Sequence, residues 1–306
     1  MRPRTSIAVS IVMLCAGCNA PGHSGGGKLP PVERPTGPMP LDAAQSYVLA
    51  LVNHDRAEQG LEPVELDDVA SKTAERHVRD MVAHGFTAHW GTDGSVPEQR
   101  YTEAGGTDFV QENAACFFDG ETRQVEPNPT FEAVQLEQIE AAFMAEVPPN
   151  DGHRKNILKP VHKLLGVGLA KPVGVSQPCM SQEFVDDYGD YEALPATAKP
   201  GQKITVAGAV QDPVEFGGVG LSKIDPQAPI SAAKLNSTNV YNVPEPYVMF
   251  FPAGYKTPKP VTVNGKDFSI TVPLDRGPGR YGVSVWGRYP GSDPLVMISL
   301  RIITVK

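Results

Sequence analysis

The chain has 306 residues, and at roughly 150 residues per domain this length favours two domains. It carries 27 Lys and Arg against 35 Asp and Glu, which gives a formal net charge of −8. The sequence shows no cluster of basic residues along which a phosphate backbone would bind, so the composition argues against nucleic acid as a partner.

The amino terminus has the layout of an export signal. Arg2 and Arg4 precede an apolar run that ends at Leu14, and this run is too short to span a bilayer as a mature helix. Residues 14–18 resemble a bacterial lipobox, where a signal peptidase cuts before a cysteine, here Cys18, that becomes lipid-modified. Because Cys15 stands where a branched aliphatic residue is usual, plain secretion remains the alternative.

These features predict where the protein resides. We expect residues 1–18 to be a signal peptide and residues 19–40, which are rich in Gly and Pro, to be a flexible tether. A lipid on Cys18 would hold the protein on a membrane of the cell envelope, as an outer-membrane or cell-surface lipoprotein. Without that lipid the protein would be secreted.

Two helices are expected after the tether. Asp42, with Gln45 three residues later, has the spacing of a capping box, and the apolar pattern that follows predicts a helix over about residues 42–58. Asp67 can cap a second helix, whose inner face includes His77. Since nothing beside His77 in the sequence completes a site, we interpret it as a core histidine and not as a ligand.

Further along, a glutamate and a histidine lie on either side of one turn. Apolar residues recur at helical spacing up to Phe143, and Glu146 falls on the same stripe, in the expected last turn before Pro148. A carboxylate at that position opposes the helix dipole and is locally unfavourable. His153 follows the turn, and residues 166–170 read as a buried strand with two glycines.

A second histidine and a second glutamate lie earlier in the chain. His89 falls among turn residues and is expected on a loop, where binding groups concentrate. Glu112 leads into small residues that pack closely under such a loop. Taken alone, Glu112 would be interpreted as a surface charge.

Together these segments resemble the bacterial form of the CAP superfamily, also called the SCP domain. The resemblance covers about residues 41–189 and rests on several motifs in the same order: Asn53-His54-Asp55-Arg56, His89 followed by Gly94-Ser95 and Pro97, Glu112-Asn113-Ala114, Phe143 to Glu146, and Gly152-His153 ahead of Gly166-Val167-Gly168. It implies an α-β-α sandwich over residues 41–192, whose open cleft holds two histidines and two glutamates. By motif these are His89, Glu112, Glu146 and His153.

Two cysteines remain after the signal, Cys116 and Cys179. By themselves, in an oxidising compartment, they are compatible with a disulfide or with two buried thiols. The resemblance makes their two segments neighbours, and it therefore implies a disulfide between them.

The carboxy-terminal half has a different pattern. Apolar and polar residues alternate, as in half-buried antiparallel strands, in segments 203–210, 247–251, 268–272, 280–286 and 296–304. Asn264-Gly265 predicts a type I′ hairpin. We interpret residues 197–306 as an all-β sandwich of immunoglobulin-like kind, which makes the whole chain α+β. No residue here is predicted to carry chemistry, and the sequon at Asn236 is interpreted as a polar loop.

Three functions stay open. In the first, the cleft binds a divalent metal, most readily Zn²⁺, or a lipid or small cell-envelope ligand, with His89, His153, Glu112 and Glu146 as the site. In the second, the same four residues act as a metal-dependent hydrolase, with Glu112 or Glu146 as the catalytic base. In the third, the domain is a non-catalytic scaffold for protein contacts. Whether the protein is an enzyme is not decided by the sequence, because a fold alone does not fix a function.

Overall fold

The computed structural model describes residues 29–224, 229–238 and 241–306, and residues 31–306 form one compact unit. The predicted signal peptide, Cys18 and residues 19–28 of the predicted tether lie outside the described residues. No helix among the residues described is long and apolar enough to cross a membrane. The predicted domain boundary between residues 192 and 197 stays a prediction.

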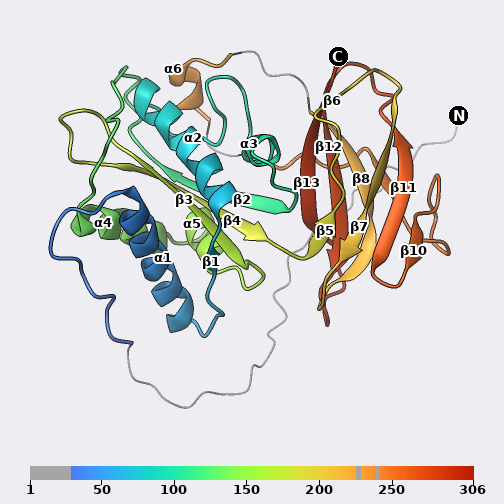
Figure 1. Ribbon diagram of the computed structural model, residues 1–306, viewed down its shortest axis with the longest axis horizontal. Helices are drawn as coiled ribbons and strands as arrows, with labels where there is room; N and C mark the ends of the chain where they lie inside the picture. Colours follow the sequence, from blue (N-terminus) through green and yellow to red (C-terminus); the bar gives the residue numbers. More distant parts are fainter. Residues whose placement is uncertain (1–28, 225–228, 239–240) are drawn as a thin grey trace, which may run out of the picture. The chain divides into compact units, whose positions relative to one another are not determined.

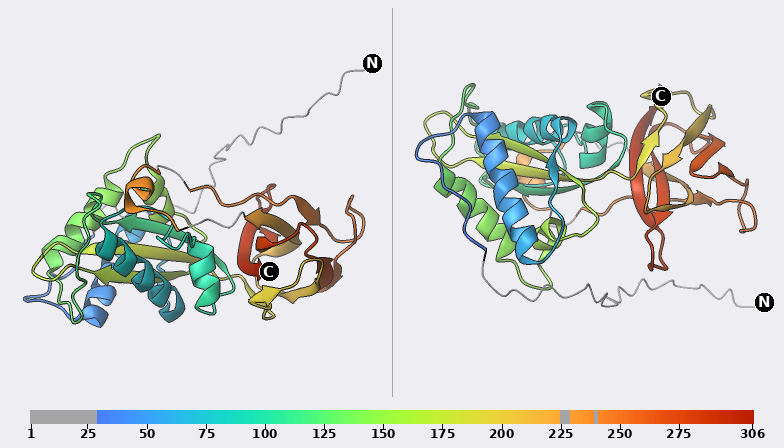
Figure 2. Two further views of the ribbon diagram at one scale, coloured as in Figure 1. Left: turned by 90° about the horizontal axis from the view of Figure 1, so that it is seen from above. Right: turned by 60° about the horizontal axis from the view of Figure 1, so that its bottom comes forward.

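The first half of this unit is a four-stranded sheet with helices on both faces (Figures 1 and 2). The strand order is β1-β3-β4-β2, and only the β1–β3 pair is parallel. The strands are β1 Glu65–Leu66, β2 Phe109–Ala115, β3 Leu164–Ala170 and β4 Cys179–Asp186, and the helices are α1 Leu41–Glu58, α2 Asp68–His84, α3 Pro97–Glu103, α4 Ala133–Met144 and α5 Gly152–Ile157.

The period-two pattern of β3 explains why helices pack on both faces of the sheet. Leu165, Val167 and Leu169 lie in one core together with apolar residues of α1, α4 and α5. The alternate residues, Gly166 and Gly168, face α2. A Cβ atom on Gly166 would lie 2.2 Å from a backbone carbon of α2, and the same holds for Gly168, so only glycine lets this helix lie directly on the strand.

The ends of the first two helices are set differently. Asp67 is the N-cap of α2, as predicted, and its side chain accepts a hydrogen bond from the Ala70 amide. The capping box predicted for α1 is wrong, because the helix begins at Leu41 and its N-cap, Pro40, makes no side-chain cap hydrogen bond. Gln45 instead donates its amide N–H to the Val167 carbonyl oxygen at 2.7 Å and so ties α1 to the sheet.

The predicted position of Glu146 also needs correction. Helix α4 ends at Met144 with Ala145 as its C-cap, so Glu146 lies beyond the last turn. The helix thus ends before the proline pair, which could not continue it, but earlier than the sequence predicts. The unfavourable dipole contact inferred from the sequence does not arise, because the carboxylate turns to accept hydrogen bonds from the next segment.

The second half of the unit contains two sheets, one of strand order β10-β11-β7-β5 and one of order β6-β13-β12-β8-β9. Valines and isoleucines from both sheets share one core, so the two sheets pack face to face, and the mixed α and β content agrees with the predicted class. The immunoglobulin-like kind stays a prediction. The elements are β5 Gly189–Tyr191, β6 Thr197–Ala198, β7 Lys203–Val210, β8 Glu215–Ile224, α6 Ala232–Leu235, β9 Val248–Phe250, β10 Thr262–Asn264, β11 Asp267–Pro273, β12 Gly279–Arg288 and β13 Val296–Val305.

Strand β8 was missed because its sequence contains three glycines. These glycines mark close approaches. A Cβ atom on Gly218 would lie 2.7 Å from the Phe250 carbonyl oxygen, and one on Gly220 would lie 2.5 Å from the Ser284 hydroxyl. The strand is therefore central in its sheet, between β12 and β9, even though its composition resembles that of a loop.

The predicted hairpin is present, but its turn type is wrong. Asn264 pairs with Asp267, so Gly265 and Lys266 are the two central residues of the turn. Of these two, only Gly265 has a positive φ, of 63°. A positive φ at the first central residue alone is typical of a type II′ turn, whereas type I′ needs it at both.

Between β8 and β9 the chain returns to the first half. Leu235 of α6 is buried in a core that also holds Met81 and other residues of α2. The Asn236 side chain accepts a hydrogen bond from the Thr87 amide and donates one to the Gly85 carbonyl oxygen, both at 3.0 Å. The asparagine of the sequon therefore fixes this segment against the loop that carries His89.

Candidate functional site

The site is a cleft of about 430 Å³ that is lined mainly by residues of the first half of the unit. All four residues predicted by motif line it, and most of its other lining side chains are also polar. The side chains with the most evident chemistry are His89, Glu98, Glu112, Glu146, His153 and Tyr241.

The first histidine and glutamate form a partly buried pair. His89 lies on the loop after α2, and its Nδ1 is 2.9 Å from Oε1 of Glu112 on β2. The His89 side chain is 30% exposed, whereas that of Glu112 is fully buried. The interpretation of Glu112 as a surface charge is therefore wrong. The carboxylate accepts the Nδ1 hydrogen of an imidazole whose Nε2 remains available to the cleft.

Arg100 is the permanent cation beside Glu112. Its Nη2 donates to Glu112 Oε2 at 2.6 Å, and its Nη1 donates to the His89 carbonyl oxygen at 3.1 Å. Burial by itself would raise the pKa of Glu112, but neighbouring positive charge and the bond to His89 outweigh burial and hold this pKa well below its usual range. Glu112 is therefore an ionised carboxylate inside the protein.

His77 is a core histidine, as predicted, although it also lies near the site. Its Nε2 is 2.8 Å from the Ala88 carbonyl oxygen and 3.6 Å from Glu112 Oε1. Burial lowers the pKa of His77 to about 4, and the charge of Arg100 adds to this effect. Since His77 is neutral at neutral pH, we assign the ionisation of Glu112 to Arg100.

The second histidine and glutamate form a similar pair. His153 lies in the first turn of α5, and its Nδ1 is 2.6 Å from Glu146 Oε1. The other carboxylate oxygen of Glu146 accepts the backbone N–H of His153 at 2.9 Å. The Phe143 ring lies 4.5 Å from the imidazole, centroid to centroid. Glu146 thus fixes both the backbone and the ring of His153. The Nε2 atom of His153 does not bond to this carboxylate.

Two asparagines hold the floor of the cleft. Asn113, next to Glu112, donates its side-chain N–H to the His153 carbonyl oxygen at 3.2 Å. The side chain of Asn156 on α5 donates to Asn113 Oδ1 at 3.0 Å and lies 2.9 Å from Nε2 of the buried His162. These bonds connect β2 to α5, so the two histidine–glutamate pairs are held in one hydrogen-bonded framework.

The sequence analysis missed Glu98 and Tyr241. Glu98 lies on α3 and is 1% exposed, and its Oε2 accepts the Tyr241 hydroxyl at 2.7 Å. Burial raises the pKa of Glu98 to about 7, even though the bond from Tyr241 acts in the opposite direction. Pro97, next to Glu98, was part of a recognised motif, but no local signal pointed to Tyr241, which is 143 residues away in the sequence.

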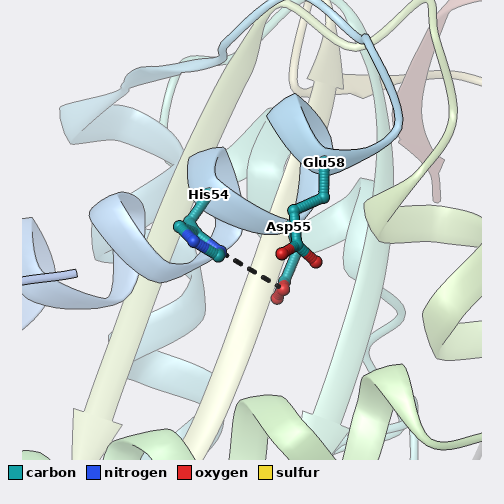
Figure 3. A group of neighbouring side chains, drawn as sticks. All are labelled: His54, Asp55 and Glu58. Atoms are coloured by element: carbon teal, nitrogen blue, oxygen red, sulfur yellow. Dashed lines mark ion pairs between the residues drawn. The ribbon is translucent and has the colours of Figure 1, made fainter. Parts of the chain in front are cut away.

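A separate group of potential metal ligands lies on α1. Among the described residues, His54, Asp55 and Glu58 are the group of three whose potential ligand atoms all lie within 4.8 Å of one another (Figure 3). None of the three lines the cleft. Their side chains project from consecutive turns of one helix, and Glu58 is exposed.

The predicted disulfide is confirmed. Cys116, which directly follows β2, is bonded to Cys179, the first residue of β4. The two cysteines are 63 residues apart in the sequence. Because β2 and β4 are paired strands, the bond ties the two strands together at one end of their ladder.

The fold and the cleft agree with a match to a known family. Residues 49–174 match the model of the Cysteine-rich secretory protein family, CAP, which supports this family for the first half of the chain. The Bacillus subtilis (strain 168) protein YkwD is 27% identical over 148 residues, which are 48% of this chain and 49% of that protein. The chain thus spans about half the length of this curated relative.

Two solved structures are also similar. One is an extracellular protein containing a SCP domain from Bacillus anthracis str. Ames, with 20% identity, 48% of this chain and 41% of that chain covered, and a TM-score of 0.36. The other is an outer surface protein from Borrelia burgdorferi, with 14% identity, 48% of this chain and 96% of that chain covered, and a TM-score of 0.34.

Proposed function

We propose that this chain is an exported protein whose cleft binds a divalent metal ion through the imidazoles of His89 and His153. The observation that carries this proposal is that each Nδ1 faces a carboxylate, Glu112 in one pair and Glu146 in the other. A carboxylate that accepts the Nδ1 hydrogen fixes the tautomer, orients the ring and makes the other nitrogen, Nε2, a stronger ligand. Both imidazoles line the same cleft.

The donor set fits a borderline metal such as Zn²⁺. Imidazole nitrogen suits Zn²⁺, Cu²⁺ and Ni²⁺. Two protein ligands are fewer than the three usual in catalytic zinc sites, so the remaining positions would be open to water or to an added ligand. Glu112 and Glu146 then serve as the outer shell that supports the two imidazoles.

The bonding of the two carboxylates favours binding over hydrolysis. Glu112 accepts from His89 through one oxygen and from Arg100 through the other. Glu146 likewise uses both oxygens on His153. A general base needs an oxygen that can reach a water or a substrate proton, and both carboxylates are already engaged.

Isothermal titration calorimetry with ZnCl₂ at neutral pH tests the metal site. We expect the wild type to bind Zn²⁺ and the double variant His89→Ala/His153→Ala to lose this binding. His84→Ala is the matched control, because His84 is a half-exposed histidine on α2 that bonds to Asp80 outside the cleft. His54→Ala removes the imidazole of the α1 group and should likewise leave the cleft binding unchanged.

The same titration separates a metal site from a purely structural network. Metal binding needs neutral imidazoles, so the affinity should fall as the solution is acidified from neutral pH. Absence of zinc binding in the wild type, or equal binding in the double variant with its circular dichroism spectrum unchanged, contradicts the proposal.

We further propose that the mature protein is anchored through a lipid on Cys18. The proposal is supported by the basic start, the short apolar run and the Ala16-Gly17-Cys18 sequence. Cell fractionation of the wild type and Cys18→Ser tests it. We expect the Cys18 variant to leave the membrane fraction, and an equally membrane-bound Cys18 variant would exclude this anchor.

A further inference from the structure

Glu98 is a buried carboxyl group on the wall of the cleft with one oxygen uncommitted. Its Oε2 accepts the Tyr241 hydroxyl, whereas Oε1 has no hydrogen-bond partner among the described residues. Arg100, two residues away in the sequence, pairs with Glu112 and not with Glu98. A buried acceptor without a partner is costly, and such groups in native proteins often mark a site for a ligand or an ordered water.

Tyr241 is held in place by the first half of the unit, although it belongs to the connection between α6 and β9. Its ring meets the Trp90 ring edge to face, with centroids 5.0 Å apart, and lies 6.2 Å from the His89 ring. Upstream, the burial of Leu235 and the two bonds of Asn236 attach the same connection to the His89 loop. The aromatic side chain is therefore positioned before any ligand arrives, which reduces the entropy lost on binding.

The lining of the cleft narrows the class of ligand. Its apolar members are prolines and valines, whereas most of its lining residues are asparagines, a glutamine and titratable side chains, so a lipid chain would leave many polar groups without a partner. Because Arg100 neutralises Glu112, the carboxyl groups of Glu98 and Glu146 are the ones that disfavour an anion. A volume of about 430 Å³ suits a small molecule.

We propose that Glu98 and Tyr241 form a recognition subsite for the hydroxyl or amide N–H groups of an uncharged sugar unit bound in the cleft. Glu98 Oε1 accepts a hydrogen bond from the ligand, and the Tyr241 ring supplies the apolar contact beside it. This inference rests on the proposed function only in taking the cleft as a ligand site. It gives the carboxy-terminal half a direct part in specificity, because Tyr241 comes from that half.

The test uses the mature full-length protein after removal of metal with EDTA and dialysis. The probe is N-acetylglucosamine, which offers hydroxyl and amide donors, and binding is followed by calorimetry and by tryptophan fluorescence, since Trp90 contacts Tyr241. Glucuronic acid, a sugar of similar size with a negative charge, is the comparison ligand. We expect it to bind at least about tenfold more weakly than N-acetylglucosamine.

Two variants and one control locate the subsite. Tyr241→Phe keeps the ring and removes the hydroxyl that orients Glu98, and Glu98→Ala removes the acceptor. Each should weaken N-acetylglucosamine binding about tenfold, the usual effect of losing one buried hydrogen bond. Tyr255→Phe is the control, because Tyr255 is a 65% exposed tyrosine that does not line the cleft.

No binding of N-acetylglucosamine at millimolar concentrations overturns the proposal. So does unchanged binding by a folded Tyr241→Phe variant, or equal binding of glucuronic acid. Because the protein is free of metal in this experiment, the result is independent of the zinc titration. The sugar result can therefore be interpreted even if the protein does not bind zinc, and the zinc result can be interpreted even if the protein does not bind the sugar.

Discussion

The buried ion pair between Arg100 and Glu112 yields the sharpest prediction about stability. The Arg100 side chain is 1% exposed and that of Glu112 is fully buried, and their nearest atoms are 2.6 Å apart. In Arg100→Met an apolar chain of similar length replaces the guanidinium, so Glu112 becomes a buried carboxylate without a cation. Breaking a buried pair in this way costs about 3–5 kcal/mol of unfolding free energy.

The loss should depend on pH, with a sign fixed by the direction of the pKa shift. In the wild type the folded pKa of Glu112 is depressed, so its contribution is present above the unfolded pKa and is lost as the pH falls through the folded pKa. Without Arg100, burial would instead raise the folded pKa above the unfolded value. The variant would then bind a proton on folding, so its stability would fall as the pH rises from 5 to 7.

Urea unfolding at pH 5 and pH 7, followed by tryptophan fluorescence, measures both effects. Arg100→Met should lose more stability at pH 7 than at pH 5. The double variant Arg100→Met/Glu112→Gln, in which the charge is removed, should regain a large part of the loss at pH 7. A loss below about 1 kcal/mol, the size of an exposed ion pair, or an equal loss at both pH values, refutes this reasoning.

Two further predictions concern the sheet. In Gly168→Ala the new Cβ would lie 2.2 Å from a backbone carbon of Ala74 on α2, which should lower the free energy of unfolding in urea by about 1–3 kcal/mol. The control Gly152→Ala has open space around its Cβ and should leave the free energy of unfolding nearly unchanged. A large loss in the control, or none in Gly168→Ala, contradicts the close packing of α2 on β3. Replacing Cys116 and Cys179 by serine opens a loop of 63 residues and should lower the free energy of unfolding by about 4 kcal/mol. In the wild type, a thiol titration of the denatured, non-reduced protein should find neither of these cysteines free.

Local features of the sequence were predicted well wherever the deciding contacts lie within a few residues. Asp67 caps α2, and Gly85 ends it in the left-handed conformation with φ 65°, because both effects act within one turn of helix. Alternation of apolar and polar residues gave β7 with its observed bounds, Lys203–Val210. The predictions failed at Asp42 and at the end of α4 because the side chains there bond to other segments. Gln45 bonds to the Val167 carbonyl oxygen and Glu146 bonds to His153.

The cleft shows which features could not be predicted from the sequence alone. His89, Glu112, Glu146 and His153 were found because ordered motifs mark them, yet their pairing and the burial of Glu112 follow from how β2, α5 and the His89 loop pack together. By itself the sequence determined the caps of α2 and most strands, since these depend on spacing along the chain, and the resemblance of its ordered motifs to a family marked the four cleft residues. Only the tertiary structure decided that Arg100 neutralises Glu112 and that Tyr241 reaches Glu98, because such contacts between distant residues leave no periodic signal in the sequence.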